Sequence, residues 1–241
     1  MGMWRTTQVP RRVFSRAGRS NVHHEPETAD RTMTDLPESP AAERNKQPIL
    51  EVLQRLLPAH GRALELASGT GQHAAWFGAG LPGWTWQPSE ASSAALPTIR
   101  AWVQRAGVAN VRPPLLLDIT DPVWPSEESP AAEALREPFD AIFCANLLHI
   151  APWAVCPALM QGARRHLAPG APLIVYGPFL EGDVPTAPSN LDFDASLQRQ
   201  NPAWGIRQRE AVERCALDAG LRLRQRIPMP ANNLILVFER V

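Results

Sequence analysis

From residue 39 onward, apolar side chains recur with two different periods, one typical of helices and one typical of buried strands. Residues 39–58 place leucine and isoleucine at helical spacing, and Ser39 followed by Pro40 is a typical helix start. Further helical patterns cover 71–81, 91–107, 152–170 and 207–220. The apolar runs that we expect to be strands are 63–67, 84–88, 111–119, 139–146, 171–179, 221–229 and 232–241.

The order of these segments predicts how the sheet is built. Strands and helices largely alternate through the first five strands, which favours a parallel sheet with helices on both faces. The last two strands are joined through the short segment "PMPAN", and a connection this short favours an antiparallel pair because parallel neighbours need a crossover. We therefore expect an α/β fold: a doubly wound, Rossmann-like, seven-stranded and mostly parallel sheet with an antiparallel C-terminal edge strand.

Two parts of the chain depart from this alternation. Residues 1–38 are expected to be an N-terminal extension, because residues 1–24 hold five arginines and no acidic residue, and Met33 opens a segment that reads as a natural start. We expect the extension to be disordered or spurious rather than a targeting helix, because its apolar face is poorly developed. Residues 39–241 are expected to form one domain, in which the polar stretch 180–207 is an ordered substrate cap.

Composition narrows the classes of function. The chain has 24 basic and 24 acidic residues and no net charge, which removes the usual electrostatic argument for binding nucleic acid or a membrane surface. Its three cysteines, Cys144, Cys156 and Cys215, have spacings that suit neither a zinc site nor a disulfide framework. We therefore expect core thiols in a cytoplasmic protein that binds no metal and acts as a monomer or homodimer.

The segment "LELASGTGQH", residues 64–73, carries the first sign of a ligand. Ligands of doubly wound sheets bind beyond the carboxyl ends of the strands, and this loop follows the first strand. Gly69 and Gly71 allow a tight turn and a close backbone approach, with Ala67 and Ser68 leading into it. Glu90, just beyond the second strand, is suitably placed to accept hydrogen bonds from ribose hydroxyls. Together these residues predict an adenosine-containing ligand, and "GTGQHA" also fits a nicotinamide fingerprint.

Three features favour S-adenosylmethionine over a nicotinamide cofactor. Glu65 lies inside the strand before the glycines, where nicotinamide folds usually keep an apolar residue. Asp118 ends the third strand, where it is suitably placed to accept from an adenine amino group, with Ile119 beside the ring. The closing strand pair is absent from ordinary nicotinamide folds. An NAD(P)-dependent oxidoreductase remains the less favoured enzyme class, since Tyr176 lacks a lysine four positions later.

With these residues in view, the chain resembles the DUF938 family, also named UPF0585, which includes the methyltransferase-like protein 26 group. The matching segments are "SPAAERNKQPILEVL", "LELASGTGQHAAWF", "WQPSE", "FDAIFCANLLHIAPW", "YGPF", "NLDFDASLQRQNPAWGIR" and "MPANNLILVF". The resemblance implies a class I S-adenosylmethionine-dependent methyltransferase with cofactor contacts around Glu65, Gly69, Gly71, Glu90 and Asp118. It also implies that "ERNK" folds over the cofactor site. The family commonly has aspartate where this chain has Glu90.

Several residues are candidates for the remaining contacts and the chemistry. In "ERNK", Arg44 offers a cation for a methionine carboxylate, with Asn45 beside it. His73 is expected to be a neutral wall of the cofactor site. Asn146 and His149 follow the fourth strand, where a residue can position the acceptor or accept its proton. Tyr176, at the end of the fifth strand, is the third candidate for a catalytic role, and Asn146 also counts among the cofactor contacts.

The substrate cap supplies the last candidates. The residues that we expect to contact a small-molecule methyl acceptor are Asn190, Asp194, Trp204 and Arg207. A neutral surface without an aromatic and basic stripe disfavours nucleic acid as the substrate. The competing hypothesis is a non-catalytic module that binds S-adenosylmethionine or a partner without transferring a methyl group.

Overall fold

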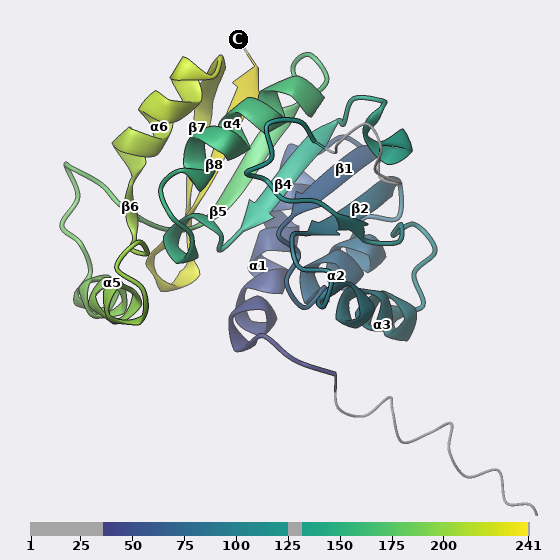
Figure 1. Ribbon diagram of the computed structural model, residues 1–241, viewed down its shortest axis with the longest axis horizontal. Helices are drawn as coiled ribbons and strands as arrows, with labels where there is room; N and C mark the ends of the chain where they lie inside the picture. Colours follow the sequence, from purple (N-terminus) through teal and green to yellow (C-terminus); the bar gives the residue numbers. More distant parts are fainter. Residues whose placement is uncertain (1–35, 125–131, 241) are drawn as a thin grey trace, which may run out of the picture. The chain divides into compact units, whose positions relative to one another are not determined.

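The computed structural model describes residues 36–124 and 132–240, so most of the predicted extension, 1–38, lies outside the described residues. These ranges fold into a sheet flanked by helices (Figure 1). The helices are α1 (Pro40–Leu56), α2 (Gln72–Gly80), α3 (Leu96–Ala106), α4 (Val155–His166), α5 (Pro188–Gln200) and α6 (Arg209–Asp218), with short 3₁₀ helices η1 (Glu133–Leu135), η2 (Leu148–Ile150) and η3 (Pro230–Asn232). The strands are β1 (Gly61–Leu66), β2 (Trp84–Glu90), β3 (Leu115–Leu116), β4 (Ala141–Ala145), β5 (Pro172–Leu180), β6 (Arg207–Gln208), β7 (Leu221–Met229) and β8 (Asn233–Arg240).

The sheet confirms the predicted fold class. Its strand order is β3-β2-β1-β4-β5-β8-β7, and β6 pairs with β5 outside this path. Strands β1 to β5 pair in parallel, whereas β8 is antiparallel to both β5 and β7. The antiparallel pair therefore lies at one edge of the sheet, with β7 outermost and the C-terminal strand β8 inside it.

Two segments differ from their predicted secondary structure. The strand expected over 111–119 shrinks to β3, because Pro113 and Pro114 have no N–H groups for the ladder, and only a single bridge joins Val111 to Trp86. The polar stretch 180–207 holds α5 and the start of β6. α5 has few apolar residues on its inner face, so periodicity gave no helix signal there; only Asn190 and Leu197 are buried.

Two apolar clusters fill the two sides of the sheet. One joins α4 and α6 to the sheet and includes Leu64, Leu159, Val212 and Phe238. The other joins α1 and α2 to it and includes Leu53, Phe77 and Trp86. Burial of this kind stabilises a fold by about 25 cal/mol per Å² of apolar surface. Successive residues of a strand point to opposite faces of the sheet. Because helices cover both faces, both sets of side chains are buried, and the strands appear in the sequence as continuous apolar runs.

We expect Gly71→Ala to destabilise the domain more than Gly69→Ala. Both residues have positive φ, 57° at Gly69 and 87° at Gly71, which costs an alanine about 1–2 kcal/mol. A Cβ on Gly71 would also lie 2.7 Å from the Ile99 Cα, whereas one on Gly69 meets nothing within 4 Å. The expected losses are about 2–5 kcal/mol for Gly71→Ala and about 1–2 kcal/mol for Gly69→Ala, measured by urea unfolding. Equal losses would contradict the packing of α2 against α3.

Candidate cofactor and acceptor site

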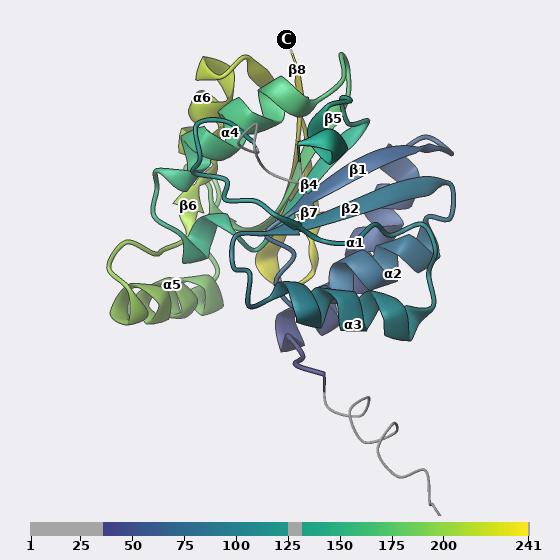
Figure 2. The same cartoon turned by 45° about the vertical axis from the view of Figure 1, so that its right-hand side comes forward.

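The site lies where the parallel strands end. Residues following β1, β2, β3 and β4 meet at the carboxyl edge of the sheet, and the elements can be followed in Figure 2. The strand register aligns Glu65 of β1 with Pro88 of β2 and Phe143 of β4. This pairing brings the β1 loop beside the end of β2, where Glu90 lies, and beside Asn146.

The loop after β1 is held in place by β2. Ser68 donates its backbone N–H to the Ser89 carbonyl at 2.9 Å, and Ser89 returns a backbone N–H to the Ser68 hydroxyl at 3.2 Å. Gly69 donates its N–H to Glu90 Oε2 at 2.9 Å. Ala67 has φ 54°, an uncommon value for a residue with a Cβ. The sequence predicted a tight turn at Gly69 and Gly71, and the structure adds the hydrogen bonds that fix it.

Glu65 lies below this loop and is 1% exposed. Its Oε2 accepts a hydrogen bond of 2.6 Å from the Trp86 indole Nε1. Burial raises the pKa of Glu65 to about 8, the Trp86 hydrogen bond opposes this, and the nearby Glu90 charge adds to it. The carboxyl group is therefore mostly protonated at pH 7, and a cation beside it would favour loss of that proton.

A small cavity of about 160 Å³ opens beside the loop. Its apolar walls include Ile119 and Leu147, and its rim carries the carboxylates of Glu90 and Asp118. Asp118 Oδ1 accepts two hydrogen bonds from Thr120, one of 2.8 Å from the backbone N–H and one of 2.7 Å from the hydroxyl. These bonds orient the Asp118 carboxylate beside the cavity. An apolar cavity edged by two carboxylates offers a ligand both a contact surface and hydrogen-bond acceptors.

The start of α1 is fastened to the glycine loop through Gln72. The Gln72 Oε1 accepts from the Ser39 backbone N–H at 2.6 Å and from the Thr70 hydroxyl at 2.9 Å, while its Nε2 donates to Glu43 at 3.1 Å. Sequence reasoning missed Gln72, which is 3% exposed. The sequence did contain a signal for this residue: a glutamine that begins a helix directly after a glycine turn and stands next to a histidine.

His73 and Asn45 form a second fastening between α2 and α1. Their Nε2 and Oδ1 atoms lie 2.6 Å apart, and because Oδ1 can only accept, the proton of His73 sits on Nε2. Burial, together with the nearby Lys46 charge, lowers the pKa of His73 to about 4. His73 also stacks on Phe77 with ring centroids 5.2 Å apart. His73 is thus neutral and buried between α1 and α2, and its role as a wall of the cofactor site stays a prediction.

Tyr176 and Arg44 lie together near the start of α1. Tyr176 is 4% exposed, and burial raises its pKa while hydrogen bonding to Asn45 and the charge of Arg44 oppose the rise. Arg44 itself is exposed. This placement leaves Arg44 available to an anionic group, whereas Tyr176 is part of the buried wall on which Asn45 rests.

Asn146 and His149 come directly after β4, as predicted. Asn146 has φ 56° and donates its N–H to the Tyr176 carbonyl at 2.9 Å. His149 is 6% exposed and packs edge-to-face on Phe193 of α5, with centroids 5.6 Å apart. Burial, with the Arg207 charge adding to it, lowers the pKa of His149 to about 4. Its imidazole is therefore neutral at pH 7.

The cap residues Asp194 and Arg207 hold backbone in place. Asp194 Oδ1 accepts the Ile206 N–H at 2.6 Å, and Gly205 donates its N–H to the His149 carbonyl at 3.0 Å. Arg207 donates from Nε to the Leu148 carbonyl at 2.9 Å. It also donates to the carbonyls of Ala151 and Ala203.

These bonds give Arg207 and Asp194 a positioning role around His149. The two other cap candidates lie apart from these bonds. Trp204 is partly buried and closes the turn 201–204 by donating its backbone N–H to the Asn201 carbonyl. Asn190 is 8% exposed and lines a second cavity. Acceptor contact by the four cap residues stays a prediction.

The family of the chain follows from a direct match. The model of the family described as "Protein of unknown function (DUF938)" matches residues 37–240, and the chain belongs to this family.

Solved structures with the same fold are methyltransferases. Mitomycin 7-O-methyltransferase MmcR has a TM-score of 0.68 and 17% identity, with 83% of this chain and 55% of that chain covered. CalO1, a methyltransferase in calicheamicin biosynthesis in its SAH-bound form, has a TM-score of 0.65 and 16% identity, with 83% and 55% covered. An O-methyltransferase family 2 protein from Planctomyces limnophilus, in complex with apigenin, has a TM-score of 0.66 and 18% identity, with 83% and 60% covered. The domain has a methyltransferase fold, and the chain spans less than two thirds of each of these structures.

Two searches of the described residues complete the picture. Over 36–124 and 132–240, the structure holds no group of three or more His, Cys, Asp or Glu side chains that could bind a metal ion. In the same part of the chain, every helix is too short or too polar to cross a membrane.

We expect Glu65→Gln to remove a pH dependence of stability. The folded protein keeps the Glu65 proton up to about pH 8, whereas the unfolded chain releases it near 4.5. The wild type should therefore lose stability relative to the variant as pH rises between these values, by about 1.4 kcal/mol per pH unit. Urea unfolding of both proteins from pH 5 to 8 measures the difference, and the histidines common to both cancel. Parallel stability curves would show that Glu65 is ionised in the fold.

We expect Arg207→Gln to raise the pKa of His149 above its value of about 4, because the variant removes the positive charge while most of the burial remains. The imidazole resonances of His149, identified by their loss in His149→Ala, report this pKa in an NMR titration. Arg165→Gln is the matched control, since the Arg165 charge acts on His166 instead. An unchanged or lowered His149 pKa in Arg207→Gln would contradict the assigned role of Arg207.

Proposed function

We propose that this protein is an S-adenosylmethionine-dependent methyltransferase that acts on a small-molecule acceptor. The observation that carries the proposal is the cavity at the carboxyl edge, where Glu90 and Asp118 border apolar walls beside the Gly69 turn. The fold it shares with methyltransferases supports the same reading. Residues 39–241 would form the catalytic domain, with 180–207 bordering the acceptor side.

The described residues fit the proposed cofactor. A Cβ on Gly69 would meet nothing within 4 Å, so the loop leaves open space where a ligand can approach its backbone. Glu90 is placed to accept from ribose hydroxyls and Asp118 from the adenine amino group, with Ile119 against the ring. Ala67 and Ser68 complete the turn. Arg44 is exposed and offers a cation to the carboxylate of the methionine end, whereas the buried Glu65 would face the ammonium as a carboxylate once it loses its proton.

The acceptor side follows from Asn146 and His149. Bound S-adenosylmethionine supplies a methyl group that is already activated by its sulfonium. The protein must therefore orient the acceptor and take up or release its proton. Alignment supplies several kcal/mol, up to about 7–11 kcal/mol in the best models. The neutral ring of His149 is able to accept a hydrogen bond from an acceptor O–H or N–H, while Asn146 borders the same edge.

Small-molecule acceptors agree with what related folds bind. One neighbour is named as a mitomycin O-methyltransferase and another holds apigenin. The absence of net charge in the chain gives no support to nucleic acid as the substrate.

Calorimetric titration with S-adenosylhomocysteine and NADH, run in parallel, tests the proposal. We expect micromolar binding of S-adenosylhomocysteine and none of NADH. Glu90→Gln should weaken binding about tenfold or more, since the amide no longer offers two acceptor oxygens to a ribose. His149→Ala is the matched control and should bind with wild-type affinity, because it lies on the acceptor side. Binding of NADH alone would overturn the proposal in favour of an oxidoreductase. Binding without methyl transfer to any acceptor would favour the non-catalytic module.

A further inference from the structure

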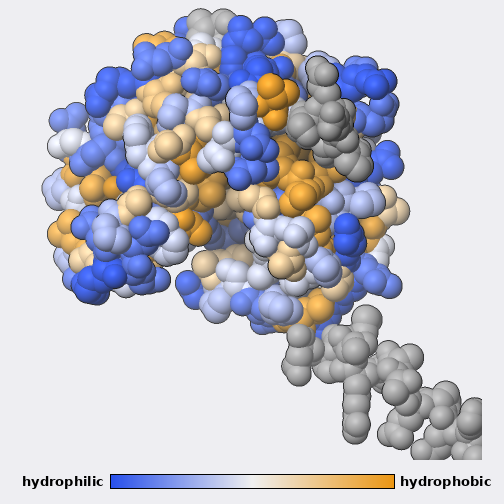
Figure 3. All heavy atoms as spheres, viewed as in Figure 1, coloured by the Kyte–Doolittle hydropathy of each residue, from blue (hydrophilic) through white to orange (hydrophobic). Residues whose placement is uncertain are grey.

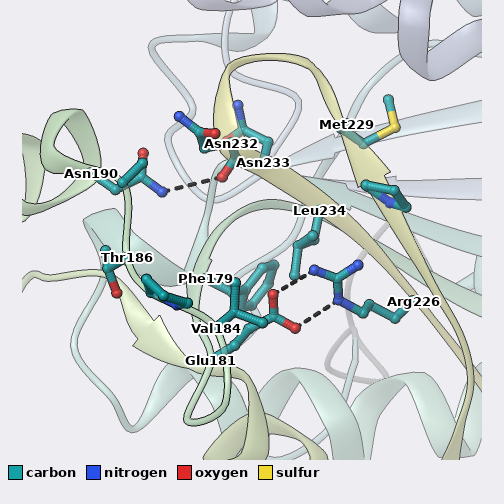
Figure 4. Close-up of a pocket in the computed structure, with 13 residues that line it drawn as sticks. Phe179, Glu181, Val184, Thr186, Asn190, Arg226, Met229, Asn232, Asn233 and Leu234 are labelled. Carbon is teal, nitrogen blue, oxygen red and sulfur yellow. Dashed lines mark hydrogen bonds and ion pairs between the residues drawn. The ribbon is translucent and has the colours of Figure 1, made fainter.

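A second cavity, of about 200 Å³, lies at the carboxyl end of β5. Figure 4 shows it between the chain that leads into α5 and the turn that joins β7 to β8. Its apolar wall includes Phe179, Val184, Met229 and Leu234. In Figure 3 the surface is indented between the lobe that carries α5, at lower left, and the part formed by α1 and α3. The cavity is thus part of the same edge of the sheet as the candidate cofactor site.

Two independent contacts place this cavity next to His149. Leu234, in the cavity wall, is the cross-strand partner of Gly177, and a Cβ on Gly177 would lie 3.5 Å from His149 Nδ1. Asn190, also in the wall, is three residues before Phe193, which packs on His149. Residues three apart on a helix are neighbours, about 5–6 Å apart. One residue therefore separates the cavity wall from His149 on each side, Gly177 on β5 and Phe193 on α5.

The charged groups of the cavity wall neutralise one another. Glu181 accepts from Arg226 Nε at 2.6 Å, and a second bond from Arg226 makes the pair bidentate. Arg209 Nε lies 3.1 Å from Glu181 Oε2, the same oxygen that accepts from Arg226 Nε. The Arg226 guanidinium holds the pKa of Glu181 below its usual value. Since both wall charges are engaged in this ion pair, a charged ligand would find no free counter-charge here, and its burial would be costly.

Asn190 brings an amide to the cavity wall. The residue is 8% exposed, and its Nδ2 donates to the Asn232 carbonyl at 3.2 Å (Figure 4). Asn190 Oδ1 accepts no hydrogen bond from the described residues and is not fully buried, so it is open to a ligand in the cavity. An accessible amide oxygen on the wall favours a ligand that brings an O–H or N–H donor.

We propose that this cavity holds the body of the methyl acceptor and selects a small uncharged molecule that has an apolar body and carries an O–H or N–H group. The inference rests on the proposed methyltransferase function. The apolar wall contacts the body of the acceptor, Asn190 accepts from its polar group, and His149 lies at the end nearer the cofactor site. Anionic and cationic acceptors of the same size are excluded by the closed ion pair.

Three probes that share a 4-fluorophenyl ring and differ in charge test this selectivity: 4-fluorophenol, 4-fluorobenzoate and 4-fluorobenzylamine. Their binding to the full-length protein is measured by fluorine NMR, with and without S-adenosylhomocysteine. The neutral phenol should bind at least about tenfold tighter than either charged probe, because burying an unpaired charge is unfavourable. Equal binding of the three probes, or no binding of the phenol at millimolar concentration, would overturn the proposal.

Variants locate the binding. Val184 is 49% exposed on the cavity wall, so Val184→Trp should fill the cavity without disturbing the core and abolish phenol binding. Leu217→Trp, at a 60% exposed position on α6, is the matched control and should bind the phenol like the wild type. Asn190→Leu removes the acceptor oxygen and should weaken phenol binding severalfold. Phenol binding that survives in Val184→Trp refutes this location.

The two proposals fail separately. In one outcome, the protein binds the phenol, Val184→Trp abolishes that binding, and S-adenosylhomocysteine does not bind. This result would support the cavity as a binding site but overturn the methyltransferase function, and with it the assignment of the ligand as a methyl acceptor. Binding of S-adenosylhomocysteine without phenol binding would keep the function and overturn the cavity.

Discussion

The parallel pairing of β1 with both β2 and β4 is the constraint on which the site depends. Parallel neighbours point their carboxyl ends the same way, so the loops that follow β1, β2 and β4 meet at one edge. The bond from the Gly69 N–H to Glu90 then closes the loop of β1 onto the end of β2. Gly71 lets the next helix approach α3 closely. Each of these contacts exists only because the strand register places its partners side by side.

Burial without charge is the common electrostatic feature of the site. Glu65, His73 and His149 are all buried, and burial moves the pKa of each toward its neutral form at pH 7. Glu90, Asp118 and Arg44 are more exposed, and the carboxylates of Glu90 and Asp118 border the cavity. In such an arrangement, a ligand that carries separated charges finds its partners among the exposed groups. The interior of the site stays neutral and offers hydrogen bonds. It suits a reagent whose methyl group is already activated, because the acceptor then needs orientation more than a strong base.

The cap acts on the site mainly through the backbone. Residues 205–207 bond to the carbonyls of Leu148, His149 and Ala151, which fixes the short 3₁₀ turn that carries His149. Asp194 in α5 holds the same segment through the Ile206 N–H. Because α5 also supplies Phe193 to His149 and Asn190 to the second cavity, one helix contacts both His149 and the wall of that cavity. A shift of α5 would change the position of both together.

The sequence by itself determined the fold class, the parallel pairing of the first five strands and the cofactor candidates, because apolar periodicity, Gly-x-Gly and strand-end carboxylates are local signals. It also identified Asn146 and His149 correctly as residues that follow β4. It missed α5, whose face is not apolar, and Gln72, whose partners Ser39 and Glu43 lie on another element. Only the tertiary structure decided that Asp194 and Arg207 bond to backbone N–H and carbonyl groups. It also decided that burial makes Glu65 and His149 neutral. The ion pair of Glu181 with Arg226 in the cavity wall was likewise visible only in the structure. Hydrogen-bond partners, desolvation and ion pairs all depend on contacts between distant segments, which no local pattern encodes.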